Sequence, residues 1–319
     1  MTGVQTCALP ICSQPGRYEV RGTVTSTDFD WTPENFAGFY YDPDNNVGNE
    51  ILSATISDEI LSGSPPYGLV YETRGQLKPF RFLDWGSFCV IGFLGKECFC
   101  RYAENGPSVT GYLWEKSVDR DALQKGQLLE VLKDDDSEQT ITEDRPLKLE
   151  EGYQLHLKNV DESGERVFVE LKKDGKLIDN KQINPGKTGT LSTETYIYRQ
   201  TIGGQKNVVT VAVHFKNAFR SGYGFIGTVD GIWQLSDKPI LVQEGMQFDK
   251  MTANVVDPQE MRISMTNQGS AIKLSRNKQV RLMDGIGLRT ADSDYLRYYI
   301  FQEMMMEAKP EMGSDQEKN

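Results

Sequence analysis

The sequence RPLKLEEGYQL, residues Arg145–Leu155, has a near copy in KPILVQEGMQF, residues Lys238–Phe248. Each copy has a basic residue, a proline, a short apolar stretch, a Glu-Gly pair and an apolar-Gln-apolar triplet. Proline lacks a backbone donor and suits a linker or a sheet edge, whereas Glu-Gly predicts a turn between two strands. The repeat therefore predicts two similar crossings between domains. Chance similarity of two turn segments is the alternative.

The repeat predicts an all-β chain with two β-sandwich domains joined by short linkers. The segment from Gln243 to Phe301 is too short for a sandwich of its own, so we expect it to return to the first domain. We predict a discontinuous first domain, 18–145 plus 239–302, with the second domain, 146–238, inserted into it. Residues 303–319 are predicted to be a disordered tail. A linear series of two or three small sheets is the alternative.

The first residues are expected to lie outside the fold. Met1–Ile11 resembles the translation of a common sequencing adaptor, so residues 1–17 are predicted to be adaptor-derived and disordered. A stunted signal peptide is the alternative, but no basic residue precedes the short apolar run. On the adaptor interpretation, the native signal peptide was lost by truncation of the gene fragment.

The net charge of −11 and the absence of a Lys/Arg block argue against a nucleic-acid partner. Such a charge suits a soluble surface or the lining of a pore that repels anions. Beyond the first residues the cysteines are Cys89, Cys98 and Cys100, an odd number. We expect buried thiols, with a disulfide from Cys89 to Cys98 or Cys100 as the alternative.

Turn signals separate segments with the two-residue period of β-strands. Val208–Phe219 alternates, which places Val209, Val211, Val213 and Phe215 on one predicted face. Hairpins are predicted around Leu94-Gly95-Lys96 and around Lys173-Asp174-Gly175. Further predicted strands are Tyr18–Thr25, Phe36–Tyr41, Glu50–Ile56, Leu69–Thr73, Leu128–Lys133 and Leu296–Phe301.

The sequence shows no catalytic constellation. Its two histidines, His156 and His214, lie in predicted strands without a serine or cysteine elbow nearby, and no zinc motif occurs. We therefore predict that the protein is not an enzyme and has no small-molecule substrate. The four tryptophans are predicted to be core residues, with sugar stacking as the alternative.

A weak calcium-binding signal occurs in DPDNNVG, residues Asp42–Gly48, where Asp42, Asp44 and Asn46 present oxygen ligands at alternating positions. Val47 stands where the EF-hand loop requires glycine, and Ser53 stands where the bidentate glutamate belongs. No other cofactor is predicted. A solvated turn is the favoured interpretation of this loop, and Asp134–Asp136 is likewise predicted to be a solvated loop.

Blocks spread through the chain resemble the S-layer proteins of methanogenic archaea, in particular the S-layer family duplication domain. The most specific is WTPENFAGFYYDPDNNVG, residues Trp31–Gly48. Further blocks in family order are Lys78–Trp85, Val90–Gly95, Leu147–Tyr153, Val169–Gly175, Gly231–Asp237 and Ala291–Tyr299. Together they cover one repeat unit, about Tyr18–Phe301.

The resemblance implies two β-sandwich domains and a structural role in an extracellular S-layer lattice. Identical subunits would coat the cell, with acidic pores acting as a charge-selective molecular sieve. The partner would be the protein itself, with membrane contact through a tether that this chain lacks. A secreted β-sandwich adhesin or carbohydrate-binding module is the alternative function. Sugar-dependent quenching of tryptophan fluorescence would favour that alternative.

Overall fold

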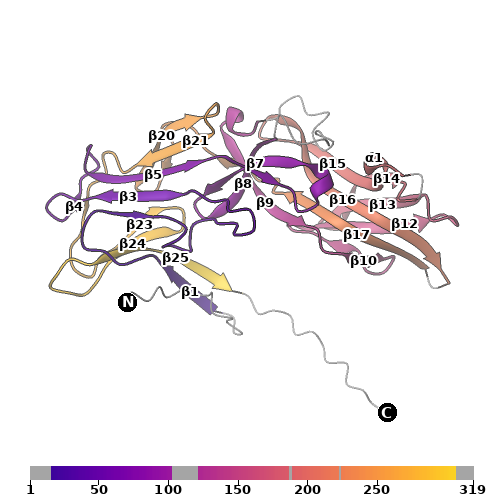
Figure 1. Ribbon diagram of the computed structural model, residues 1–319, viewed down its shortest axis with the longest axis horizontal. Coiled ribbons are helices and arrows are strands. Elements are labelled where there is room, and N and C mark those ends of the chain that lie inside the picture. Colours follow the sequence, from indigo (N-terminus) through magenta and orange to yellow (C-terminus); the bar gives the residue numbers. More distant parts are fainter. Residues whose placement is uncertain (1–15, 103–120, 187–188, 223, 307–319) are drawn as a thin grey trace, which may run out of the picture.

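The computed structural model describes residues 16–102, 121–186, 189–222 and 224–306, and shows an elongated molecule with two lobes (Figure 1). Almost all regular structure in these residues is antiparallel strand, which confirms the predicted all-β class. The described part of the chain adds the short helices η1 (Leu83–Trp85), η2 (Leu123–Lys125) and α1 (Leu191–Glu194). None of its helices has the length and apolar character needed to cross a membrane.

One lobe contains three sheets. The six-stranded sheet runs β19 (Gln247–Phe248), β20 (Met251–Asp257), β21 (Arg262–Thr266), β5 (Gly68–Arg74), β3 (Ile51–Thr55) and β2 (Phe29–Trp31). The four-stranded sheet runs β1 (Gly16–Arg21), β25 (Tyr298–Met306), β24 (Ile286–Thr290) and β23 (Gln279–Met283). The small pair is β22 (Ile272–Lys273) and β4 (Ile60–Leu61).

A nine-stranded sheet extends from this lobe into the other. Its main path is β15 (Thr195–Ile202), β16 (Gln205–Ser221), β17 (Gly224–Leu235), β9 (Gln127–Asp135), β8 (Lys96–Tyr102), β7 (Ser87–Phe93) and β6 (Gln76–Pro79). β10 (Gln139–Thr142) pairs with β17, and β18 (Ile240–Leu241) pairs with β9. The second lobe adds a sheet of β11 (Leu147–Lys148), β12 (Tyr153–Val160), β13 (Val167–Lys173) and β14 (Lys176–Ile183).

The hairpin β7–β8 lies between two hydrophobic cores. Every residue of β7 is buried. Cys89 and Ile91 join a first core with Leu52 and other residues of the six-stranded sheet, whereas Val90 joins a second core with Trp233. Burial on both faces explains why this segment reads as an apolar run without alternation.

A third core lies in the second lobe, where β11–β14 pack against β15–β17. Val211, Val213 and Phe215 of β16 belong to this core, as predicted from their alternation. The predicted position of Val209 is wrong, since Val209 belongs to the second core. The reason is a bulge: Tyr198 pairs with Val211 and Arg199 with Val209, which leaves Thr210 as an extra residue.

Both copies of the repeated sequence form a turn at Glu-Gly. The N–H of Tyr153 donates to the carbonyl of Glu150, and at the equivalent position Met246 donates to Gln243. The first copy is a hairpin between β11 and β12. In the second copy the strands separate, because β18 pairs with β9 and β19 pairs with β20. The second copy is thus a crossing between two sheets.

The two copies lie beside one another. The Lys238 ammonium of the second copy lies 3.4 Å from Glu151 Oε1 of the first. Just before the second copy, the Ser236 hydroxyl and the Asp237 N–H donate to the same carboxylate at 2.9 and 3.1 Å. The C-terminal strands return to the first lobe, where Ile286 and Ile300 join the first core. However, the nine-stranded sheet contains strands from both sides of the predicted boundaries. The division into 18–145 plus 239–302 and 146–238 therefore stays a prediction.

Several predicted strands and both predicted hairpins are present, with three departures. Phe36–Tyr41 is not a strand: the N–H groups of Asn35 and Phe36 both donate to the carbonyl of Thr32, which coils this segment. Strand β25 continues to Met306, beyond the predicted start of the tail at residue 303, because its end pairs with β1. Gly16 and Arg17, predicted to belong to the disordered adaptor segment, begin strand β1, where their backbones pair with Met306 and Met305. The remainders of the two predicted disordered segments, residues 1–15 and 307–319, lie outside the described residues.

Candidate functional site

The predicted calcium loop is closed by the side chain of its own first residue. The N–H groups of Asp44 and Asn45 donate to Asp42 Oδ1 at 3.0 and 3.4 Å, and Asn45 Nδ2 donates to Oδ2 at 3.0 Å. Backbone hydrogen bonds in both directions join Asp42 and Val47. The preference of aspartate for such turns explains this local structure. Val47 points into the second core, which anchors the loop to the sheet.

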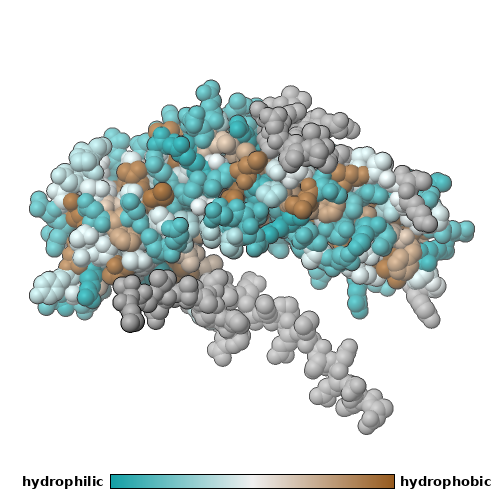
Figure 2. Space-filling model, viewed as in Figure 1, coloured by the Kyte–Doolittle hydropathy of each residue, from teal (hydrophilic) through white to brown (hydrophobic). Residues whose placement is uncertain are grey.

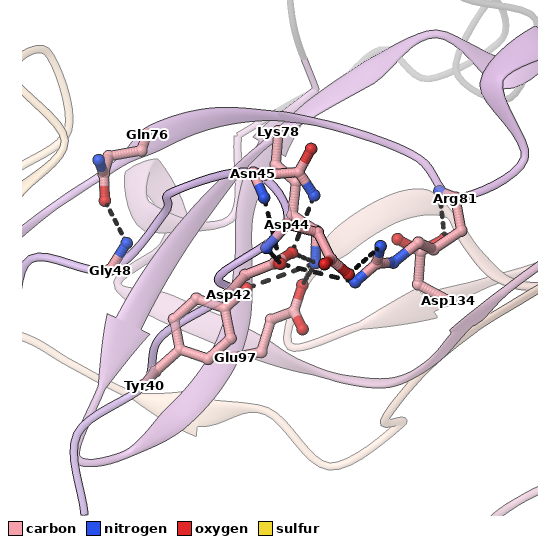
Figure 3. Close-up of polar contacts among 10 residues, drawn as sticks. All are labelled: Tyr40, Asp42, Asp44, Asn45, Gly48, Gln76, Lys78, Arg81, Glu97 and Asp134. Carbon is pink, nitrogen blue, oxygen red and sulfur yellow. Dashed lines mark hydrogen bonds and ion pairs between the residues drawn. The ribbon is translucent and has the colours of Figure 1, made fainter. Parts of the chain in front are cut away.

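Lys78 of β6 reaches the closed loop from the sheet (Figure 3). Its Nζ lies 3.0 Å from Asp42 Oδ2 and 2.7 Å from Glu97 Oε1, and it is 3.4 Å from the Tyr40 hydroxyl. The side chains of Lys78 and Asp42 are only 3% and 4% exposed. A buried ammonium with two carboxylate partners ties the loop to β6 and β8.

Arg81 extends this arrangement on the other side of the loop. Its guanidinium lies 2.8 Å from Asp44 Oδ2 and 3.5 Å from Asp42 Oδ1. Its backbone N–H donates to Asp134 Oδ1 at 3.0 Å. We call the six charged residues the Lys78 cluster: Asp42, Asp44, Lys78, Arg81, Glu97 and Asp134. All of them except Asp44 line a cavity of about 280 Å³.

The cluster shifts the pKa values of its members in opposite directions. Burial raises the pKa of Asp42, but hydrogen bonds from Asn45 and Lys78 and the charge of Arg81 outweigh burial and lower it to about 2. Burial raises the pKa of Asp134 to about 7, although the hydrogen bond from the Arg81 N–H and the charge of Lys78 lower it in part. The Oδ2 atom of Asp134 is buried without a hydrogen-bond partner among the described residues. Asp42 is thus held ionised, whereas Asp134 titrates near neutral pH.

The calcium prediction for Asp42, Asp44 and Asn46 stays a prediction. Asp42 and Asp44 already have Lys78 and Arg81 as cationic partners. The Oδ1 atom of Asn46 accepts a hydrogen bond from the Tyr41 hydroxyl at 2.8 Å. Nowhere in the described ranges do three His, Cys, Asp or Glu side chains gather in the way that metal ligands do.

The other residues that the sequence singled out lie apart from the cluster. The Nδ1 atom of His214 lies 2.5 Å from Asp230 Oδ1, and its ring stacks on Phe82 at 4.4 Å. His156 lies in β12. The three described cysteines are buried and form no disulfide bond, as expected. Trp31, Trp85 and Trp233 are completely buried, which confirms the core prediction for these three, and Trp114 lies outside the described residues.

Sequence reasoning missed Lys78, Arg81 and Glu97 as partners of the loop. The cluster draws residues from the loop, from β6 and the segment that follows it, from β8 and from β9, and no local pattern predicts that these segments meet. The block Lys78–Trp85 resembles a family block, and this was the one sequence signal that pointed to Lys78 and Arg81. A resemblance of this kind does not show that these residues contact the Asp42 loop. Asp134, predicted to be a solvated loop residue, lies in β9 and inside the cluster.

We expect the Asp134→Asn variant to lose part of the pH dependence of folding. In the folded protein the pKa of Asp134 is raised to about 7, so the fold favours the protonated form. The resulting stabilisation is present below the ordinary pKa of about 4 and is lost as pH rises through 7, by on the order of 2–4 kcal/mol. Asparagine stays neutral, so denaturant titrations from pH 4 to 8 should show a shallower decline. Asp136→Asn, at an exposed position nearby, is the control and should keep the decline of the unmodified chain.

The comparisons with known proteins agree with the resemblance in the sequence. The family model described as S-layer protein matches residues 20–292. The Major S-layer protein of Methanosarcina mazei is 29% identical over 314 residues, covering 95% of this chain and 42% of the relative. The Major S-layer protein of Methanosarcina acetivorans is 28% identical over 305 residues, covering 93% and 42%.

The chain thus spans about two fifths of the length of these curated relatives. Both relatives are named as S-layer proteins. The family model covers most of the chain, including the calcium-like loop, the Lys78 cluster and both copies of the repeat. This protein belongs to the S-layer protein family.

Proposed function

We propose that this chain is a structural subunit of an S-layer, a proteinaceous lattice on the outside of the cell. The observation that carries the proposal is the family match over residues 20–292, together with relatives named Major S-layer protein. The partners of the chain would be further copies of the same protein, placed side by side. The lattice would serve as a protective coat, and the chain itself would perform no chemistry.

The physical character of the molecule supports a passive structural role. The described residues have three hydrophobic cores, and the sheet that contributes to all three connects the lobes. The Lys78 cluster adds ion pairs and a hydrogen bond between the Asp42 loop, β6, β8 and β9. In the view of Figure 2 the hydrophobic residues form small patches separated by hydrophilic ones. We therefore propose polar edges and loops, rather than one large apolar face, as the surfaces of assembly.

We further propose that the lattice is a charge-selective sieve. Each chain has a net charge of −11, so a pore between subunits would have an acidic rim. Such a rim raises the local concentration of cations and repels anions. Small cations and neutral solutes would pass more readily than anions of the same size.

Assembly is expected to depend on salt and on calcium. Repulsion between acidic subunits opposes association, and salt screens it with a Debye length of about 8 Å at physiological ionic strength. Calcium would add bridges between carboxylates of neighbouring subunits, and Asp44 is a suitable group because its side chain is 66% exposed. We expect monomers at low salt, association at high protein concentration with sodium chloride, and stronger association with calcium at the same ionic strength.

Light scattering and electron microscopy across a salt and calcium series would measure this. The Asp44→Asn variant should weaken the calcium effect while leaving the sodium chloride effect in place. A protein that stays monomeric at millimolar concentration in every condition would leave the lattice proposal without support. If calcium and sodium chloride at matched ionic strength gave equal association, the calcium bridges between carboxylates would be contradicted, but the lattice itself would not.

A further inference from the structure

A groove lies at the outer end of the first lobe, far from the Lys78 cluster. It is formed where β5 begins and β21 ends, close to β4 in Figure 1. One wall is formed by Pro65, Pro66 and Tyr67, and the other by the segment Thr266–Gln268. The cavity has a volume of about 350 Å³, which is within the usual range for small-ligand sites.

Uncharged groups line this groove in a strongly charged protein. None of the described residues along its walls is Asp, Glu, Lys, Arg or His, although a quarter of the chain is charged. An ionic ligand would have to leave water without gaining a charged partner, which is costly. A neutral ligand meets no such penalty, and the lining therefore favours a ligand without formal charge.

One wall of the groove presents ring surfaces. Tyr67 is 44% exposed and Val70 is 39% exposed, and the rings of Pro65 and Pro66 are exposed beside them. An exposed tyrosine offers an apolar face together with a polar hydroxyl. This combination suits a ligand that has both C–H faces and hydroxyl groups.

The other wall presents amide and hydroxyl groups. Thr266 donates its hydroxyl proton to Asn254 Oδ1 at 2.6 Å, and Asn254 Nδ2 donates to Gln268 Oε1 at 3.3 Å. The side chains of Asn254 and Gln268 are exposed to solvent. An amide offers two donors and one acceptor oxygen, so it can bond to neighbouring hydroxyl groups as donor and as acceptor. These side chains hold one another in place before any ligand binds.

The floor of the groove is rigid. Asn267 is completely buried, where its Oδ1 accepts from the Leu69 N–H at 2.7 Å and its Nδ2 donates to the Leu61 carbonyl at 3.1 Å. Gly63 and Gly68 have positive φ angles, and a Cβ atom on either would lie within 2.6 Å of Asn267 oxygens. The close approach of these segments therefore requires glycine at both positions. Preorganisation of this kind reduces the entropic cost of binding.

We propose that this groove binds a neutral saccharide, with the sugar ring against Tyr67 and its hydroxyl groups on Asn254 and Gln268. The site goes beyond the lattice function and does not depend on it. In the cell envelope such a saccharide would be either free in solution or part of a glycan on a neighbouring molecule. The chemistry of recognition is the same for both sources.

Saturation-transfer NMR and calorimetry with a panel of neutral methyl hexosides and disaccharides would test the proposal on the full chain. We expect at least one neutral saccharide to bind with a Kd of about 1 mM or tighter. The matching uronic acid should bind more weakly, because no described cation lines the groove. Tyr67→Ala should weaken binding roughly tenfold or more, since the ring contact is lost.

Two further variants make the result specific. Gln268→Leu keeps the approximate size of the side chain and removes its amide, so it should also weaken binding. This variant keeps the proposal testable if Tyr67→Ala does not fold. Tyr295→Ala is the matched control, because Tyr295 is 83% exposed and lies outside the groove. Competition between the free sugar and purified envelope glycans would distinguish the two sources.

Three results would overturn the proposal. The first is no binding of any neutral saccharide at tens of millimolar. The second is binding that Tyr67→Ala and Gln268→Leu leave unchanged. The third is binding of a proline-rich peptide in place of any sugar, which would assign the exposed rings to a protein partner.

Discussion

Replacement of Lys78 by methionine is expected to lower the free energy of unfolding by about 3–5 kcal/mol, the usual cost of removing one partner of a buried ion pair. Lys78 Nζ lies within 3.0 Å of carboxylate oxygens of Asp42 and Glu97. Methionine fills most of the same volume, so the loss is mainly electrostatic. Asp42 would remain buried with the Arg81 guanidinium, 3.5 Å away and itself partly exposed, as its cationic partner. Urea titration followed by circular dichroism would measure the change.

Lys96→Met is the matched control. Lys96 also pairs with a carboxylate, Glu130 at 2.8 Å, but its side chain is 45% exposed. Exposed pairs contribute about 0–1 kcal/mol, so the control should be nearly neutral. The double variant Lys78→Met with Asp42→Asn should lose less than the sum of the two single variants, because it removes both charges of one pair. If Lys78→Met and Lys96→Met lowered the free energy of unfolding equally, the ion pairs of the buried Lys78 cluster would not stabilise the fold more than an exposed pair does.

Replacement of Trp233 by alanine should cost a similar amount, about 3–5 kcal/mol, because it leaves a large cavity in the second core. Trp233 is completely buried, and its ring lies 4.9 Å from Phe80 and 4.9 Å from Phe88 in edge-to-face contacts. Its Nε1–H donates to the carbonyl of Val209 at 3.3 Å. The loss therefore includes packing, aromatic contacts and one buried hydrogen bond.

Phe219→Ala is the control for this variant, since Phe219 lies on the neighbouring strand β16 but is 48% exposed. A change within about 0.5 kcal/mol is expected at such a surface position.

The same titrations test the predicted domains. The nine-stranded sheet joins the lobes, so we expect one cooperative transition that Trp233→Ala moves as a whole. Two separate transitions, with one unaffected by the substitution, would support an independently folding domain 146–238.

Local signals in the sequence predicted much of the secondary structure. The Asp174-Gly175 pair and the Leu94-Gly95 pair form tight turns with positive φ at both residues, and each joins two paired strands. These turns depend on a few adjacent residues, so the sequence alone specifies them. The resemblance to S-layer proteins was likewise visible in contiguous blocks, and the family match confirmed it.

The sequence did not determine which core each buried residue enters. A two-residue period shows that a face is buried, but it does not identify the sheet that covers that face. Val209 and Val211 have the same predicted face, yet a bulge at Thr210 places them in different cores. The repeated sequence shows the same limit, because one copy is a hairpin and the other joins two sheets.

The Lys78 cluster and the neutral groove were decided by tertiary structure alone. Asp42, Lys78, Glu97 and Asp134 come from four separate segments, and burial between those segments converts solvated charges into a paired cluster. The groove brings residues 63–70 against Asn254 and Thr266–Gln268, nearly two hundred positions later in the chain. The sequence by itself determined strands, tight turns and family, because these depend on neighbouring residues. Long-range pairing decided the charge partners and the shape of the groove, because burial and distance exist only in the folded chain.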